Sequence, residues 1–147
     1  MIQKNILQKA SSLSIFFMLI LITIGTSSVA AQSPTILDIT AAKGGFGKVS
    51  VTVKNIGNIT AENVTMFISV NGGIFGRVNI TKVCSGCGNC SNSIEPNAAK
   101  IENTLEAGVI IGFGPINITT SAEASNAEMV SKTFNGFVLG FVVIITK

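Results

Sequence analysis

The one local arrangement that suggests chemistry is a cluster of three cysteines within seven residues, Cys84-Ser85-Gly86-Cys87-Gly88-Asn89-Cys90. CxxC spacing lets thiolates converge on one ion, so a soft metal such as Cu(I), or zinc with an added oxygen ligand, would fit Cys84, Cys87 and Cys90. In an oxidising compartment, two of the three would instead form a disulfide. The third would then stay free or bridge to a second chain. The spacing leaves these alternatives open.

A second group of residues is defined by the Asn-x-Ser/Thr pattern, which is the acceptor sequence for N-glycosylation. Five asparagines have it: Asn58, Asn63, Asn79, Asn89 and Asn117. The alternation of apolar and polar residues predicts that Asn63, Asn79 and Asn117 point outward from strands, and that the other two lie in loops. Chance matches are common in a chain rich in Asn and Thr. Glycosylation is therefore a hypothesis that depends on export.

Residue types needed for catalysis are otherwise scarce. The chain has no His, which is the commonest general base and metal ligand. It also has no nucleophile elbow, Walker loop or HExxH motif. Glu95, Glu102 and Glu106 lie near a turn at Pro96, where we expect solvated charges. The sequence therefore predicts a protein that is not an enzyme, with no catalytic residues and no cofactor.

The start of the 147-residue chain is typical of an exported protein. Lys4 and Lys9 precede the apolar run Leu13–Ile24, and small residues follow as far as Ala31. This order predicts a secretory signal peptide over residues 1–31. We therefore expect the protein to be secreted or to lie on the extracellular cell surface.

The rest of the chain, residues 32–147, is long enough for one domain. Cleavage after Ala30 or Ala31 would release it. Alternatively, Ser11–Ala31 would remain as an anchor helix, since 21 residues just cross a bilayer.

The net charge limits the partners of this domain. The whole chain carries ten basic and seven acidic residues. Without Lys4 and Lys9, eight basic and seven acidic residues remain, a net charge of +1. A nearly neutral domain has no strong electrostatic attraction to nucleic acid or anionic lipid. We expect no nucleic-acid partner, and membrane contact only through the leader if it is not cleaved.

From Thr35 onward, apolar residues recur with a period of two. Val49, Val51 and Val53 alternate with polar residues, and the segment Val64–Val70 repeats the pattern. The step Asn71-Gly72-Gly73 between two such runs predicts a hairpin. No window has the period of an amphipathic helix. The pattern predicts an all-β fold, a single antiparallel immunoglobulin-like β-sandwich of about seven strands, preceded by the signal or anchor helix.

The final segment, Gly136–Lys147, is apolar at both alternating positions, so both of its faces need cover. One interpretation is a terminal strand in the middle of a sheet. The other is that a neighbouring chain or domain buries part of this strand.

The segment from Val51 to Val64 also carries a family resemblance. Its order of strand, Asn55-x-Gly57 turn, Ala61-x-x-Val64 and strand resembles CARDB-like and related immunoglobulin-like modules of prokaryotic, in particular archaeal, secreted or surface proteins. The turn around Pro96 and the ending at Thr133–Leu139 are similar to such modules as well. The resemblance implies a secreted seven-stranded sandwich used for adhesion, spacing or presentation, and it implies no chemistry.

Three hypotheses for function follow. The first is a non-enzymatic structural or adhesion module that acts through contacts with other surface proteins or with itself. The second is a small extracellular metal-binding protein that uses the loop Cys84–Cys90. The third is a subunit of a surface filament assembled by strand exchange at its termini.

Overall fold

The computed structural model describes most of the chain, residues 35–85 and 93–146. Several predicted features lie outside these residues, namely the leader, two cysteines and one sequon (residues 1–31, Cys87, Cys90 and Asn89). Helical structure in the described part of the chain is limited to two three-residue 3-10 turns, so none of these helices is long enough to cross a membrane.

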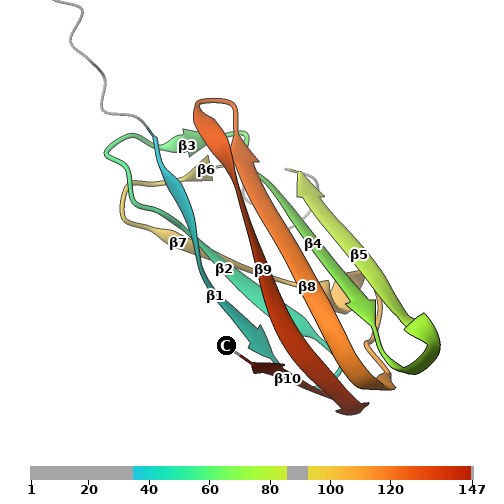
Figure 1. The fold of residues 1–147 in the computed structure, drawn as a ribbon. Coiled ribbons are helices and arrows are strands. Elements are labelled where there is room, and N and C mark those ends of the chain that lie inside the picture. Colours follow the sequence, from blue (N-terminus) through green and yellow to red (C-terminus); the bar gives the residue numbers. More distant parts are fainter. Residues whose placement is uncertain (1–34, 86–92, 147) are drawn as a thin grey trace, which may run out of the picture. The chain divides into compact units, whose positions relative to one another are not determined.

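Ten strands make up the described part of the chain, and neighbouring strands of each sheet pair antiparallel (Figure 1). The strands are β1 Leu37–Gly44, β2 Val49–Asn55, β3 Ala61–Glu62, β4 Thr65–Gly72, β5 Val78–Ser85, β6 Ser93–Ile94, β7 Ala99–Asn103, β8 Gly112–Ala124, β9 Ala127–Gly140 and β10 Val142–Thr146. The 3-10 turns are η1 Ile74–Gly76 and η2 Thr104–Glu106.

The strands form two layers of a β-sandwich. A five-stranded sheet, sheet A, has the order β10-β9-β8-β4-β5, and a three-stranded sheet, sheet B, has the order β1-β2-β7. A two-stranded sheet, β3-β6, lies at one end. Buried aliphatic side chains from both layers fill the core, among them Ile39, Val49, Val51, Val53, Met66, Ile68, Val70, Ile118 and Val138. The predicted all-β, antiparallel sandwich is confirmed.

The predicted alternation is visible in β2 and β4. Val49, Val51 and Val53 are fully buried, and the polar residues between them are partly exposed. The hairpin predicted at Asn71-Gly72-Gly73 joins β4 to β5. Gly72 has φ +137°, and a Cβ there would lie 2.5 Å from the carbonyl oxygen of Pro115, so this position requires glycine.

The turn predicted at Asn55 is held by the side chain of that residue. Asn55 is fully buried, and its Nδ2 donates to the carbonyl oxygens of Ile59 at 2.7 Å and of Ile94 at 2.9 Å. Its Oδ1 accepts from the backbone N–H of Gly57 at 3.0 Å. One amide side chain therefore closes the turn after β2 and fixes it to β6.

The C-terminal segment differs from the prediction of one strand in the middle of a sheet. Gly140, with φ +64°, and Phe141 form a two-residue turn, and Val142 pairs with Leu139 across it. The segment is thus the end of β9 followed by β10, and β10 is the edge strand of sheet A. A left-handed residue at the first turn position is what a two-residue hairpin needs, and glycine provides it. This turn and the two-residue strands β3 and β6 raise the strand count above seven.

Candidate functional site

The candidate site is a patch of exposed apolar side chains on the outer face of sheet A, where β8, β9 and β10 lie side by side. In one row across these strands, Leu139 lies opposite both Phe113 and Val142. In the next row, Phe137 lies opposite both Pro115 and Ile144. We call these six residues the face patch, and all six are exposed.

The face patch follows from a segment that is apolar at both strand positions. Inward-facing Gly136, Val138 and Val143 are buried in the core. Their neighbours Phe137 and Leu139 point outward and are 40% and 50% exposed. Contiguous exposed apolar surface of this kind marks an interaction site on a protein. The sequence indicated such a contact for residues 136–147, but the contribution of β8 emerges only from the strand register.

A row of amides borders the face patch. The next row of outward residues, beyond Pro115, Phe137 and Ile144, is polar on every strand of sheet A. They lie opposite one another in the order Asn79, Asn71, Asn117, Asn135 and Thr146. The row after it carries hydroxyl groups, in the order Thr81, Ser69, Thr119 and Thr133. These two polar rows separate the face patch from Val83 on β5 and Met129 on β9, which are exposed further along the same face.

Four of the five predicted glycosylation sites lie in the described part of the chain, and all four are exposed: Asn58, Asn63, Asn79 and Asn117. Asn79 and Asn117 are on strands as predicted, on either side of Asn71. Asn63 does not lie on a strand. It occupies the connection between β3 and β4 with φ +52°, a left-handed conformation that asparagine tolerates. Modification of these sites remains a prediction.

The cysteine cluster is described only at its first residue. Cys84 lies near the end of β5, with 2% of its surface exposed, and it is disulfide-bonded. Because Cys87 and Cys90 lie outside the described residues, the connectivity of the three cysteines remains a prediction. In residues 35–85 and 93–146, no three His, Cys, Asp or Glu side chains lie together as metal ligands would.

The glutamates near Pro96 have different surroundings. Glu102 on β7 and Glu106 in η2 both pair with Lys82 of β5, at Nζ–Oε2 distances of 3.2 Å and 2.9 Å. Glu95 is exposed and accepts a hydrogen bond from Thr60. The expectation of solvated charges is wrong for Glu102, whose side chain is only 12% exposed. This difference has a structural cause, since Lys82 faces inward from its strand.

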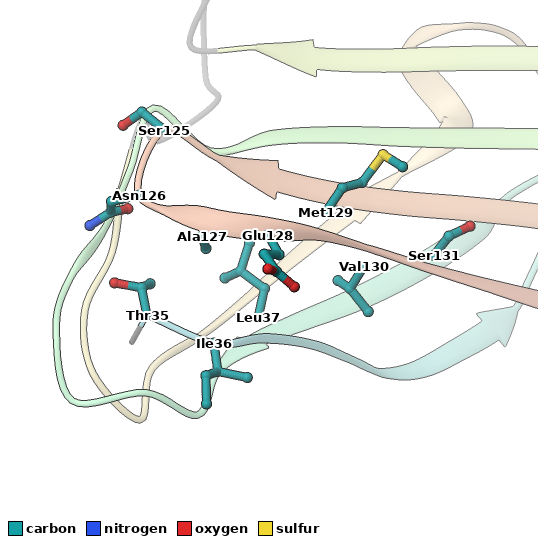
Figure 2. Close-up of a pocket in the computed structure, with 10 residues that line it drawn as sticks. All are labelled: Thr35, Ile36, Leu37, Ser125, Asn126, Ala127, Glu128, Met129, Val130 and Ser131. Carbon is teal, nitrogen blue, oxygen red and sulfur yellow. The ribbon is translucent and has the colours of Figure 1, made fainter. Parts of the chain in front are cut away.

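An open groove of about 890 Å³ lies between the start of β1 and the first half of β9 (Figure 2). Figure 2 shows Leu37 and Val130 between the two strands, and Met129 and Ser131 on the opposite side of β9. Along its outer edge, β9 pairs with β10 over Asn135–Leu139. Its first half has one bridge, from Ala127 to Thr35. The remaining backbone of this edge has no sheet partner in the described part of the chain.

Comparisons with known proteins identify no family for this chain. No family model matches it, and no curated protein matches it. Among solved structures, it is similar to wild-type OgpA from Akkermansia muciniphila, with a TM-score of 0.45 and 6% sequence identity. The alignment covers 84% of this chain and 33% of that protein. The chain thus spans about a third of that protein, and a likeness at this level has no bearing on function.

Proposed function

We propose that the protein is a secreted or cell-surface structural or adhesion module, without enzymatic activity, that acts through protein–protein contacts made by the face patch. The observation that carries this proposal is the set of six exposed apolar side chains on three neighbouring strands. Such strands present a rigid, flat surface against which a partner can pack without reordering loops. Amides and hydroxyls border the patch, as a polar rim borders an interface core.

The immunoglobulin-like assignment and the extracellular location belong to the same proposal. Two facing antiparallel sheets, and the buried Ala61 and Val64 after the Asn55 turn, support a CARDB-like module. The N-terminal signal pattern and the disulfide at Cys84 support export. The intact mass of the protein from its own source, with and without thiol alkylation, tests leader cleavage, glycans and disulfides together.

The contact itself is tested with the variant Phe137→Ser. Retention of the labelled protein on the surface of its own source cells should fall at least about tenfold, because the variant exposes a hydroxyl at the centre of the patch. Ile101→Ser is the matched control, since Ile101 is 66% exposed on β7 of the other sheet. Unchanged retention of a folded Phe137→Ser protein would refute this function.

The filament hypothesis has one observation in its favour, the open edge of β9. An extended segment from another copy could add to this edge by backbone hydrogen bonds. Ser131→Pro tests it. The backbone N–H groups of Asn135, Phe137 and Leu139 face β10, so by alternation the N–H of Ser131 faces outward. Proline therefore removes a backbone bond only to an added strand, and within the domain it removes the bond from Ser131 Oγ to the carbonyl oxygen of Thr120. Assembly that persists in this variant excludes addition at this edge.

The metal-binding hypothesis has less support. A three-thiolate site needs all three cysteines reduced, whereas Cys84 is in a disulfide. Purified protein that contains stoichiometric metal and three thiols that can be alkylated would restore this hypothesis.

A further inference from the structure

Four connections meet at one end of the sandwich, opposite the end that carries β3 and β6 (Figure 1). The backbone N–H of Gly47, between β1 and β2, donates to the carbonyl oxygen of Phe141 at 2.6 Å. The N–H of Ile110, before β8, donates to the carbonyl oxygen of Gly47 at 2.8 Å. The N–H of Gly73, between β4 and β5, donates to the carbonyl oxygen of Pro115 at 2.7 Å. The first two bonds join three of the connections to one another, and the third fixes the β4–β5 connection to β8.

Each of these connections exposes at least one large apolar side chain, and the set is Phe46, Ile74, Phe75, Val109, Ile111 and Phe141. Phe75 and Phe46 are the most exposed, at 91% and 77%. Phe75 also has φ +60°, ψ +23°, a left-handed conformation that is a true outlier for a bulky residue. Such strain persists where the surrounding structure imposes it, and it is concentrated at functional sites.

Basic residues flank the same connections. Lys43 is near the end of β1, Lys48 directly precedes β2, and Arg77 directly precedes β5. None of the three forms an ion pair with a described residue. Glu106, the acidic residue closest in sequence to Val109, is paired with Lys82.

Acidic residues without an ion pair among the described residues gather towards the opposite end, near β3, β6 and the turn between β8 and β9. They are Asp38, Glu62, Glu95, Glu123 and Glu128. A domain that is almost neutral overall is therefore basic and apolar at one end and acidic at the other.

A hollow of about 450 Å³ lies at the basic end, between the β4–β5 connection and the start of β8. Arg77 is the charged residue that lines it, and its apolar side chains come from Ile74, Phe75, Val78, Ile111 and Phe113. This combination matches an apolar chain joined to an anionic group, which is the chemistry of an anionic lipid.

We propose that this end of the sandwich, which we call the loop end, binds the surface of an anionic lipid bilayer. Its phenylalanines project singly from separate connections, so each can enter the acyl region while the flanking lysines and the arginine contact lipid headgroups. A flat protein partner would leave most of these projecting rings partly exposed. The acidic end of the domain would be repelled by the same bilayer, which orients the loop end toward it. The loop end and the face patch share Phe113. Phe75 and Phe46 belong only to the loop end, and Phe137 belongs only to the face patch.

The chain contains no Trp or Tyr, so a single introduced tryptophan reports on its own surroundings. In the full chain, the emission of Phe75→Trp should move to shorter wavelength on vesicles of equal parts phosphatidylglycerol and phosphatidylcholine, and brominated acyl chains should quench it. Ile101→Trp, on the exposed face of β7, should do neither. Because the signal comes from one side chain, insertion of an uncleaved leader does not mimic it. Phe46→Trp, on a different connection, repeats the test if Phe75→Trp does not fold.

The electrostatic part has its own measurement. Arg77→Gln, in the Phe75→Trp background, should lower the vesicle partition coefficient about fivefold, and added salt should weaken binding. Lys54→Gln, near the opposite end, should leave partition unchanged. If Phe75→Trp and Phe46→Trp respond no more than Ile101→Trp, the proposal is wrong. This outcome leaves the protein contact of the face patch, which is tested by retention of Phe137→Ser, unaffected.

Discussion

The Nζ atom of Lys82 on β5 lies 3.2 Å from Oε2 of Glu102 on β7, so an ion pair joins the two layers of the sandwich. The Lys82 side chain is 7% exposed, and the same Nζ contacts Glu106. Lys100 also contacts Glu102, at 3.4 Å. Charges that are largely removed from water are stabilised only while their partners remain.

Removing the lysine charge should therefore destabilise the fold. We expect Lys82→Met, which keeps an apolar stem, to lower the free energy of unfolding by about 2 kcal/mol, because Glu102 keeps only Lys100. Glu106→Gln should change it by less than about 0.5 kcal/mol, since Glu106 is 67% exposed. Urea unfolding measures both. Equal losses in the two variants would show that burial does not set the strength of this network.

The same cluster predicts a dependence of stability on pH. Burial alone would lower the pKa of Lys82, but hydrogen bonds to Glu106 and Glu102 and their negative charges outweigh it, so the pKa lies above its ordinary value of 10.5. Because the folded state holds this proton more tightly, the stabilisation is complete below about pH 10.5 and is lost as pH rises through the folded pKa. The stability gap between wild type and Lys82→Met should be constant from about pH 7 to 10 and should narrow above that range. A gap that widens at high pH contradicts the assignment.

Local sequence patterns were sufficient to predict strands and turns that are determined by neighbouring residues. The valines of β2 alternate because one face of a strand is buried, and Asn71-Gly72-Gly73 turns because glycine adopts positive φ. The Asn55–Gly57 turn was predicted from the same kind of signal. Its long-range bond to Ile94 was not, because contacts between distant segments leave no periodic signal.

The two proposed binding surfaces depend on the register between strands, so they were harder to predict from the sequence. The face patch combines Phe113 and Phe137 from different strands. The pattern within each segment does not indicate how the two strands are aligned. The hairpin at Gly140 was missed because both of its strands are apolar, so the run resembles one strand. Net charge says nothing about how charges are distributed. A value of +1 for residues 32–147 hides the separation of Arg77 and its basic neighbours from the acidic residues at the opposite end.

Asn55 provides a sharp test of the turn after β2. Asn55→Ala removes two donors and leaves the carbonyl oxygens of Ile59 and Ile94 without this partner, so we expect a loss of about 2–4 kcal/mol in the free energy of unfolding. Asn58→Ala is the control, because Asn58 is exposed in the same turn and should change stability by less than about 0.5 kcal/mol. Chemical denaturation of both variants, produced without glycans, measures the two changes in the free energy of unfolding. A neutral Asn55→Ala would mean that water replaces the amide.

Gly44 ends β1 and Gly45 follows it. The two glycines form a matched pair for testing how β10 is attached to the rest of the domain. A Cβ at Gly44 would collide with the carbonyl oxygen of Val143, whereas a Cβ at Gly45 would make an ordinary contact of 3.5 Å with Cγ of Lys48. The N–H of Val143 donates to the carbonyl oxygen of Gly45 at 3.0 Å, so β10 is attached to this connection.

Gly44→Ala should push β10 away from β1 and cost about 1–3 kcal/mol, because backbone atoms cannot move aside as a side chain can. Gly45→Ala should be neutral within about 0.5 kcal/mol. Thermal unfolding gives the stabilities, and amide exchange at Val143 reports whether β10 has detached. Since β10 carries Val142 and Ile144, Gly44→Ala should also weaken retention by the face patch although it alters none of its residues. If Gly44→Ala is as stable as Gly45→Ala and Val143 stays protected from exchange, β10 is not fixed by this contact, and the face patch must depend on the pairing of β9 with β10 alone.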